Sequence, residues 1–169
     1  MNQALAAWNN ADKAKAYYDM IACCGSPRWA DEMIAKRPFV SIGELSATAD
    51  QVWSSMEETD WLAAFACHPR IGERKNIHAT VQSAEWSRQE QLSAANAAER
   101  ALAELAEMNA LYEKRFGFTY IVCASGKSAD EMLSILKRRV SSDRASELRE
   151  AAEQQRQIMQ LRLRKWLAS

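Results

Sequence analysis

Side chains suited to proton transfer near neutral pH are scarce in this chain, which holds only two histidines. His78 lies in a polar loop, where we expect it to be solvated, whereas His68 stands in "FACHPRIGER", between an apolar run and a proline. A histidine at a helix end can have a purely structural role, because it interacts with the unpaired carbonyls and the negative end of the helix dipole. Pro69 and Gly72 favour a second role, because a rigid turn can present a side chain to a ligand. His68 is therefore a candidate for acid–base chemistry.

A second set of polar side chains lies in "SRQEQ". Ser87, Glu90 and Gln91 are spaced i, i+3 and i+4, so they share one face of a helix, and Ala94 and Ala95 continue that face. Small residues beside three polar ones leave room for a ligand. The same Ser-x-x-Glu spacing is also a capping box, in which Glu90 only bonds the backbone of Ser87. Both interpretations remain open from this segment alone.

An arginine interrupts the apolar face of the last predicted helix. With Ile158 as the origin of a helical wheel and about 100° per residue, Arg162 falls near 40°, inside the apolar arc. A buried arginine keeps its charge, so it needs an anionic or carbonyl partner. That partner can be a glutamate of the protein or a carboxylate or ureido group of a ligand. With His68 and the Ser-x-x-Glu-Gln set, Arg162 would complete a small polar pocket for a compact anionic substrate.

The sequence lacks the motifs typical of nucleotide, metal and nucleic-acid sites. The chain has no glycine-rich nucleotide loop, and the spacings of its histidines and four cysteines fit no metal-ligand pattern, so we predict no metal site. We expect the cysteines to be reduced thiols. With 22 basic and 22 acidic residues, the chain lacks the charge of a nucleic-acid binder, and no apolar run is long enough for a membrane span. The N-terminus does not resemble a signal peptide, so the expected compartment is the cytoplasm.

Composition and periodicity then predict the elements that would position these residues. Only 5 glycines and 3 prolines in 169 residues, with abundant Ala, Leu, Glu, Gln and Arg, indicate an all-α protein. We predict a single-domain helical bundle covering residues 1–169. The run "FTYIVCA" is β-like, but a lone strand cannot form a sheet, so we expect one extended, buried segment near residues 118–124. The predicted helices cover residues 9–24, 27–36, 41–57, 60–68, 84–115, 129–139 and 144–167.

These motifs together resemble a known family. "CGSPRWADEMIAKRPF", "DWLAAFACHPRIG", "SRQEQ", "MNALYEKRFGFTY" and "EQQRQIMQLRL" are similar to segments of the 2-oxo-4-hydroxy-4-carboxy-5-ureidoimidazoline (OHCU) decarboxylases. The resemblance covers nearly the whole chain. It implies an all-helical, cofactor-free carboxy-lyase that converts OHCU to (S)-allantoin in urate degradation. It also suggests a homodimer.

The resemblance implies a role for each candidate residue. His68, Glu90 and Arg162 would be catalytic, and the substrate contacts would be Pro69, Ser87, Gln91 and the backbone around Ile121. Some family members carry an arginine shortly after the "FGF" segment, where this chain has Ser125 and Gly126. An additional anion contact from that loop is therefore in question, although Lys127 could supply one. The alternatives are a non-catalytic helical interaction domain and a different lyase or hydrolase that shares His68.

Overall fold

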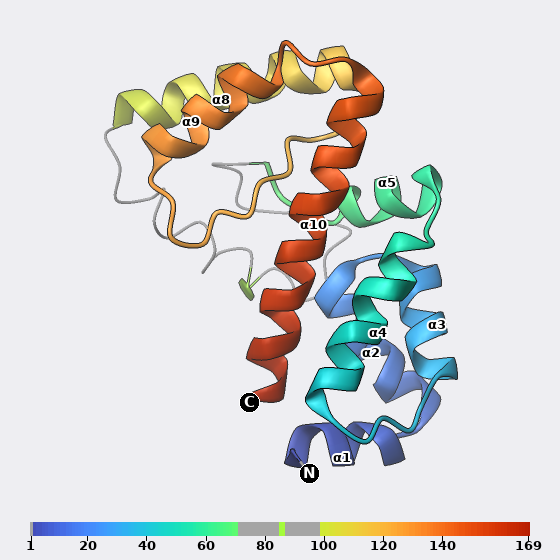
Figure 1. Ribbon diagram of the computed structural model, residues 1–169. Coiled ribbons are helices and arrows are strands. Elements are labelled where there is room, and N and C mark those ends of the chain that lie inside the picture. The colour runs from blue at the N-terminus through green and yellow to red at the C-terminus, as the bar shows by residue number, and fades with distance from the viewer. Residues whose placement is uncertain (1, 71–84, 87–98) are drawn as a thin grey trace. The chain divides into compact units, whose positions relative to one another are not determined.

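The computed structural model describes residues 2–70, 85–86 and 99–169, and the regular elements in these ranges are all helices (Figure 1). This confirms the predicted all-α class. The helices are α1 (Gln3–Asn10), α2 (Lys13–Cys24), α3 (Pro27–Ala35), α4 (Ile42–Ser54), α5 (Glu58–Ala66), α8 (Glu99–Phe116), α9 (Ala129–Arg139) and α10 (Arg144–Leu167).

Contacts divide the chain into two compact units. The first unit consists of Met1–Ala64 and Arg156–Ser169, and the second of Phe65–Gln155. The chain passes from one unit to the other within α5 and again within α10. The single domain over residues 1–169 stays a prediction.

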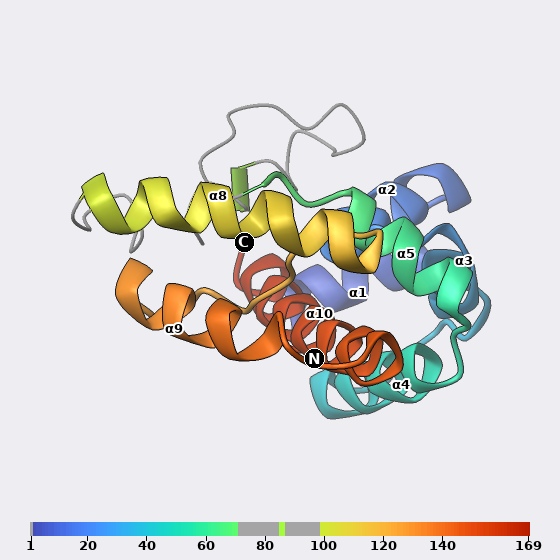
Figure 2. The same cartoon turned by 90° about the horizontal axis from the view of Figure 1, so that it is seen from above.

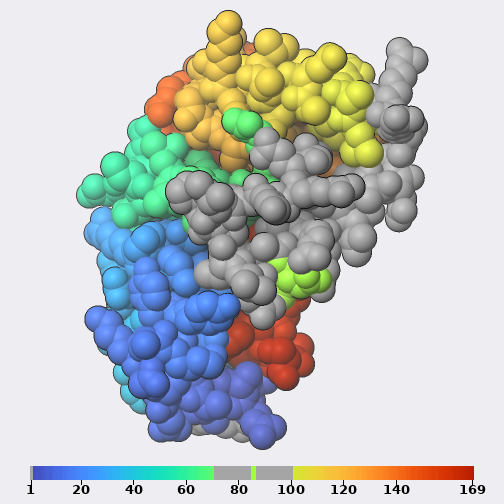
Figure 3. Space-filling model, turned by 180° about the vertical axis from the view of Figure 1, so that it is seen from behind, coloured from blue at the N-terminus to red at the C-terminus, as the bar shows by residue number. Residues whose placement is uncertain are grey.

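Local sequence signals explain the helices of the first unit. The side chains of Asn2, Asp12, Ser26 and Ser41 each accept a hydrogen bond from a backbone N–H in the first turn of a helix. Gly25, at φ 85°, ends α2 in the left-handed conformation that a glycine adopts without strain. The N-terminal helices, drawn in blue in Figure 3, form one continuous part of the surface seen in that view. The indole N–H of the buried Trp29 donates to the carbonyl of Ala49.

An aromatic cluster fills the core of the second unit. Helices α8 and α9 lie side by side in both Figure 1 and Figure 2. Tyr112 and Phe116 of α8 have ring centroids 4.7 Å apart. Phe118 and Tyr120, beyond the end of α8, lie 5.8 and 5.5 Å from the ring of Tyr112. These rings pack the segment after α8 against the helix itself.

The ends of several helices agree with the prediction. Ser128 and Glu131 form a capping box at the start of α9. Asp143 accepts from the N–H of Ser146 at the start of α10. Gly117, at φ 82°, follows the last residue of α8.

Two other boundaries were predicted wrongly. Helix α4 ends at Ser54, three residues before Glu57. Helix α5 runs from Glu58 to Ala66 and not over residues 60–68, so Asp60 lies within its first turn; the Asp60 carboxylate accepts from the N–H of Glu57. The short helix α1 was not predicted as a separate element. Of the helix predicted over residues 84–115, residues 84 and 87–98 lie outside the described residues.

The segment 118–124 is neither helix nor strand, as predicted, and its backbone is held by side chains. The N–H of Tyr120 donates to Oδ1 of Asn109 at 3.3 Å, and the N–H of Cys123 donates to Oε1 of Gln154 at 2.9 Å. The carbonyl of Ile121 accepts from Nη1 of Arg139 at 2.7 Å. Buried backbone groups need partners, and here amide and guanidinium side chains take the place of a neighbouring strand.

Candidate active site

His68 lies two residues beyond the end of α5, in the second unit. Its backbone N–H donates to the carbonyl of Phe65 at 3.1 Å, which continues the turn past the helix end. The side chain is half-buried, and its Nε2 lies 2.5 Å from Oε1 of Gln155 in α10. Gln155 is fully buried. The ring of His68 is therefore held by a specific contact, which a solvated surface histidine would lack.

An ion pair fixes the chain just after His68. Nε and Nη2 of Arg70 contact the two carboxylate oxygens of Glu113 on α8, at 2.8 and 2.7 Å. A two-point pair of this kind constrains orientation as well as distance. Pro69, between the two, is half-buried. Gly72, the other residue of the turn predicted around His68, lies outside the described residues. The Arg70–Glu113 pair was not predicted.

Arg162 belongs to the first unit and is buried, as the helical wheel predicted. Its exposed fraction is 1%, and its neighbours on α10 include the buried Ile158, Met159 and Leu163. Its charge also acts on Cys23 of α2. Burial raises the pKa of the Cys23 thiol well above the ordinary range, and the positive charge of Arg162 opposes that rise. Cys23 is therefore a protonated, unreactive thiol at neutral pH.

The Ser-x-x-Glu-Gln set belongs to residues 87–98. Ser87, Glu90 and Gln91 lie outside the described residues, so both interpretations of that segment stay predictions. The two residues immediately before it, Glu85 and Trp86, are helical, and Trp86 is 6% exposed.

Ile121 is 1% exposed, and a buried ionic cluster anchors its carbonyl. Arg139, which holds that carbonyl, also donates from Nε and Nη2 to Oε1 of Glu147, at 2.7 and 2.5 Å. The hydroxyl of Tyr112 donates to the same oxygen, and the guanidinium lies 4.9 Å from the ring centroid of Tyr120. Burial lowers the pKa of Arg139, but the hydrogen bond and charge of Glu147 outweigh it, so the net shift is upward. The cluster ties the segment containing Ile121 to α8, α9 and α10.

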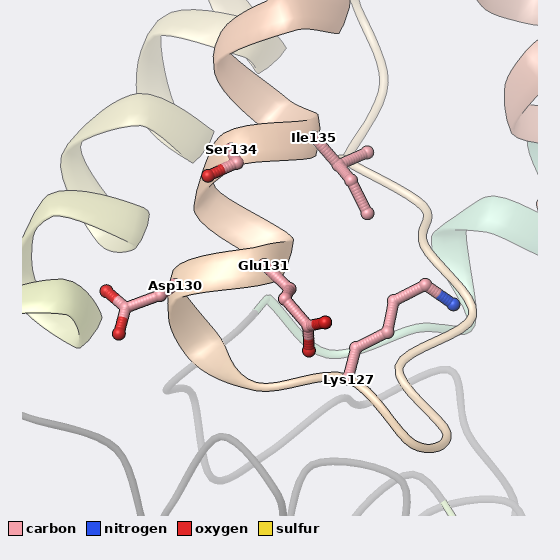
Figure 4. A pocket seen from close by; sticks show the side chains of 5 residues that line it. All are labelled: Lys127, Asp130, Glu131, Ser134 and Ile135. Atoms are coloured by element: carbon pink, nitrogen blue, oxygen red, sulfur yellow. The ribbon is translucent and has the colours of Figure 1, made fainter.

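A surface depression of about 390 Å³ lies at the start of α9 (Figure 4). It contains Lys127, which was considered as an additional anion contact. Nζ of Lys127 donates to the carbonyl of Cys123 at 2.8 Å, and Glu131 is engaged in the capping box. In Figure 4 Asp130 projects to the opposite side of the helix from Ile135. Among the described residues that line the depression, Lys127 and Glu131 have structural partners, and neither His68 nor Arg162 is one of them. It is lined by Lys127, Asp130, Glu131, Ser134 and Ile135.

Sequence reasoning missed three residues that hold the candidate site. Gln155 lies in the motif "EQQRQIMQLRL", and its place in the last helix, three and four residues after the buried Ala152 and Ala151, is the signal that indicates an inward side chain. Arg139 ends the basic run "KRR", which is typical of an exposed helix C-terminus, yet it is 5% exposed. Gln154, the third, bonds the N–H of Cys123. Each of them has a partner that is 18 to 87 residues away along the chain, which local patterns do not reveal.

Fold and site define a class: a small all-helical protein with a half-buried histidine held by a buried amide, and with a buried arginine in its last helix. The family model described as OHCU decarboxylase matches residues 9–164. The chain therefore belongs to the OHCU decarboxylase family. No helix in the described ranges is long and apolar enough to cross a membrane.

Known proteins of this kind share much of the sequence. The chain is 42% identical over 145 residues to the "Uric acid degradation bifunctional protein TTL" of Arabidopsis thaliana, which covers 85% of this chain and 44% of that protein. The chain thus spans less than half the length of that relative. It is 30% identical to the "2-oxo-4-hydroxy-4-carboxy-5-ureidoimidazoline decarboxylase" of Amia calva, over 75% of this chain and 73% of that one.

Solved structures share the fold. An OHCU decarboxylase crystallised in the presence of (S)-allantoin has a TM-score of 0.77 and 35% identity, over 94% of this chain and all of that one. An (S)-allantoin synthase has a TM-score of 0.68 at 16% identity, over 96% of this chain and 53% of that one, which indicates a shared fold alone.

Proposed function

We propose that this protein is a carboxy-lyase that decarboxylates OHCU to (S)-allantoin in urate degradation. The observation that carries the proposal is the family match over residues 9–164, which includes both His68 and Arg162. The similarity to an OHCU decarboxylase solved in the presence of (S)-allantoin supports it. The contact between His68 and Gln155 adds that this histidine has a defined orientation.

The substrate itself can accept the electrons of the reaction. Its carboxylate is on a ring carbon that also bears a hydroxyl, and the adjacent ring carbon is part of a C=N bond. When the bond to the carboxylate breaks and carbon dioxide leaves, the electron pair moves toward this imine, whose nitrogen takes up a proton. The enol-like intermediate is then protonated on one face of the ureido-bearing carbon, which sets the (S) configuration. The imine of the substrate is thus the electron sink in this route, a role that a cofactor fills in other decarboxylations.

The protein's contribution would be positioning and directed proton transfer. His68 takes the hydroxyl proton, delivers the proton to carbon, or does both, since an ordinary histidine pKa near 6.5 suits either step. Glu90 holds N–H groups of the ring or of the ureido group, and Arg162 holds a carboxylate or carbonyl of the substrate. The remaining contacts are assigned to Pro69, Ser87, Gln91 and the backbone at Ile121. Holding the substrate in one orientation accounts for the stereochemistry.

The experiment is to generate OHCU freshly from urate and to follow circular dichroism with and without the protein. We expect dichroism from (S)-allantoin to develop faster with the wild-type protein than spontaneously. His68→Asn should reduce the rate to the spontaneous background while far-ultraviolet dichroism stays that of the folded protein. Wild-type protein that leaves the background rate unchanged would refute the proposed function and favour a non-catalytic interaction domain. A fully active His68→Asn variant would refute only the role of the histidine.

The proposal includes a cytoplasmic homodimer that binds neither nucleic acid nor membranes. All four cysteines are free thiols, Cys23, Cys24 and Cys123 buried and Cys67 half-buried, which suits a reducing compartment. The dimer rests on the family resemblance. Sedimentation equilibrium at several concentrations measures the mass directly, and a constant monomer mass would exclude the dimer.

A further inference from the structure

The contact of His68 with Gln155 has a chemical consequence for the histidine. An amide oxygen can only accept a hydrogen bond, so Nε2 of His68 must be the donor across the 2.5 Å separation from Oε1. A neutral imidazole carries one proton. Donation from Nε2 therefore places the lone pair, and with it the basicity of the neutral ring, on Nδ1.

The burial of Gln155 favours its hydrogen bond with His68. Gln155 is 0% exposed, so water does not compete freely for its amide, and losing the hydrogen bond would leave a buried polar group unsatisfied. His68 is in an irregular segment after α5, whereas Gln155 is in a long helix. A side chain from a regular helix thus holds a ring whose own backbone is less constrained. The Arg70–Glu113 pair holds the same segment two residues after His68.

We propose that Gln155 is a positioning residue that orients His68 and fixes its neutral tautomer, so that Nδ1 is the atom that exchanges protons with the substrate. This inference rests on the proposed function for its catalytic part. The tautomer and the hydrogen bond are properties of the protein without substrate and can be tested without turnover.

The first test is nuclear magnetic resonance of the ¹⁵N-labelled wild-type protein above the titration midpoint of His68. We expect a downfield Nε2–H proton that exchanges slowly with solvent, together with an unprotonated Nδ1. The signals are assigned by their disappearance in His68→Asn. In Gln155→Leu the slow Nε2–H proton should be lost. A wild-type ring protonated on Nδ1, or a slow Nε2–H proton that persists in Gln155→Leu, overturns the proposal whether or not the protein turns over OHCU.

The second test is kinetic. Gln155→Leu should lower kcat by about 10- to 100-fold with little change in KM, because a misplaced catalytic group affects the chemical step more than binding. Gln155→Glu keeps the shape and adds a negative charge opposite Nε2, which favours the imidazolium. Gln155→Glu should therefore shift the titration midpoint of His68 to higher pH. The part of the pH dependence of kcat that follows the neutral form of His68 should shift in the same direction. Wild-type kcat in Gln155→Leu, or an unshifted midpoint in Gln155→Glu, overturns the proposal.

Gln160→Leu is the matched control. Gln160 is also buried in α10, and its Nε2 donates to the carbonyl of Ser46 and to Asp50. The substitution removes a buried, hydrogen-bonded amide of the same helix and should lower thermal stability as Gln155→Leu does. It should leave the His68 resonances and kcat unchanged. Equal loss of kcat in both variants would show that Gln155 acts only through stability and would refute its positioning role.

Discussion

Among single residues, Arg162 departs most clearly from ordinary packing, because its charged side chain is only 1% exposed. Arg162→Lys keeps the charge but loses the planar fork that matches a carboxylate or ureido group. Losing one charge-assisted hydrogen bond costs about 1.5–3 kcal/mol. We therefore expect kcat/KM to fall by about 10- to 100-fold. Arg164→Lys, the same change at an exposed position of the helix, is the control. Equal kinetics for the two variants would remove Arg162 from the site.

Glu90 presents the other open question at this scale, since its carboxylate either caps a helix or contacts the substrate. Glu90→Gln removes the charge and keeps the shape. If Glu90 contacts the substrate, kcat/KM falls while the melting temperature changes little. A lower melting temperature with normal kcat/KM would identify a capping box instead. Thermal unfolding and steady-state kinetics on the same preparation separate the two roles.

Among the elements, α8, α9 and α10 are joined to the 118–124 segment by the Arg139–Glu147 pair. Glu147 is 1% exposed, and both Arg139 and Tyr112 donate to it. Glu147→Gln would leave the Arg139 guanidinium buried without its anion, which typically costs about 3–5 kcal/mol. Urea unfolding measures this loss. Glu107→Gln, the same change at an exposed position of α8, should alter stability by less than about 0.5 kcal/mol.

The helices show how far local sequence determines this fold. The ends of α2, α9 and α10 follow from Gly25, Ser128 and Asp143, because capping depends on residues within one turn. Periodicity also sufficed for the burial of Arg162. Arg139 could not be inferred in this way, since its burial depends on a carboxylate eight residues later and on a distant carbonyl.

The candidate site was predictable only in part, for a related reason. The motif around His68 singled out the residue as a candidate, and the structure places it just after the end of α5, in contact with Gln155. Its partner Gln155 is 87 positions away, and only tertiary packing brings the two together. The roles of Ser87, Glu90 and Gln91 stay predictions.

For the molecule as a whole, buried acidic groups should limit stability at high pH. Burial raises the pKa of Cys23, Tyr112 and Tyr120 in the folded state from ordinary values of 9.0 for the thiol and 10.0 for the phenols. Folding therefore keeps these groups protonated, whereas the unfolded chain releases their protons at the ordinary values. The stabilisation is fully present below about pH 9 and decreases as the pH rises further, because the unfolded state then binds fewer protons.

The expected curve has a definite shape. The contribution of these three groups to the free energy of unfolding should change little between about pH 7 and 8.5 and then fall. Each group that is ionised in the unfolded chain but still protonated in the folded protein contributes a slope of about 1.4 kcal/mol per pH unit. Cys23→Ala removes the group that titrates first. That variant should be less stable at pH 7, because it leaves a cavity, but should lose less of its stability between pH 9 and 10 than the wild type. Urea unfolding at half-unit pH intervals gives both curves. Parallel curves for the two proteins would mean that Cys23 is not protected from ionisation by burial.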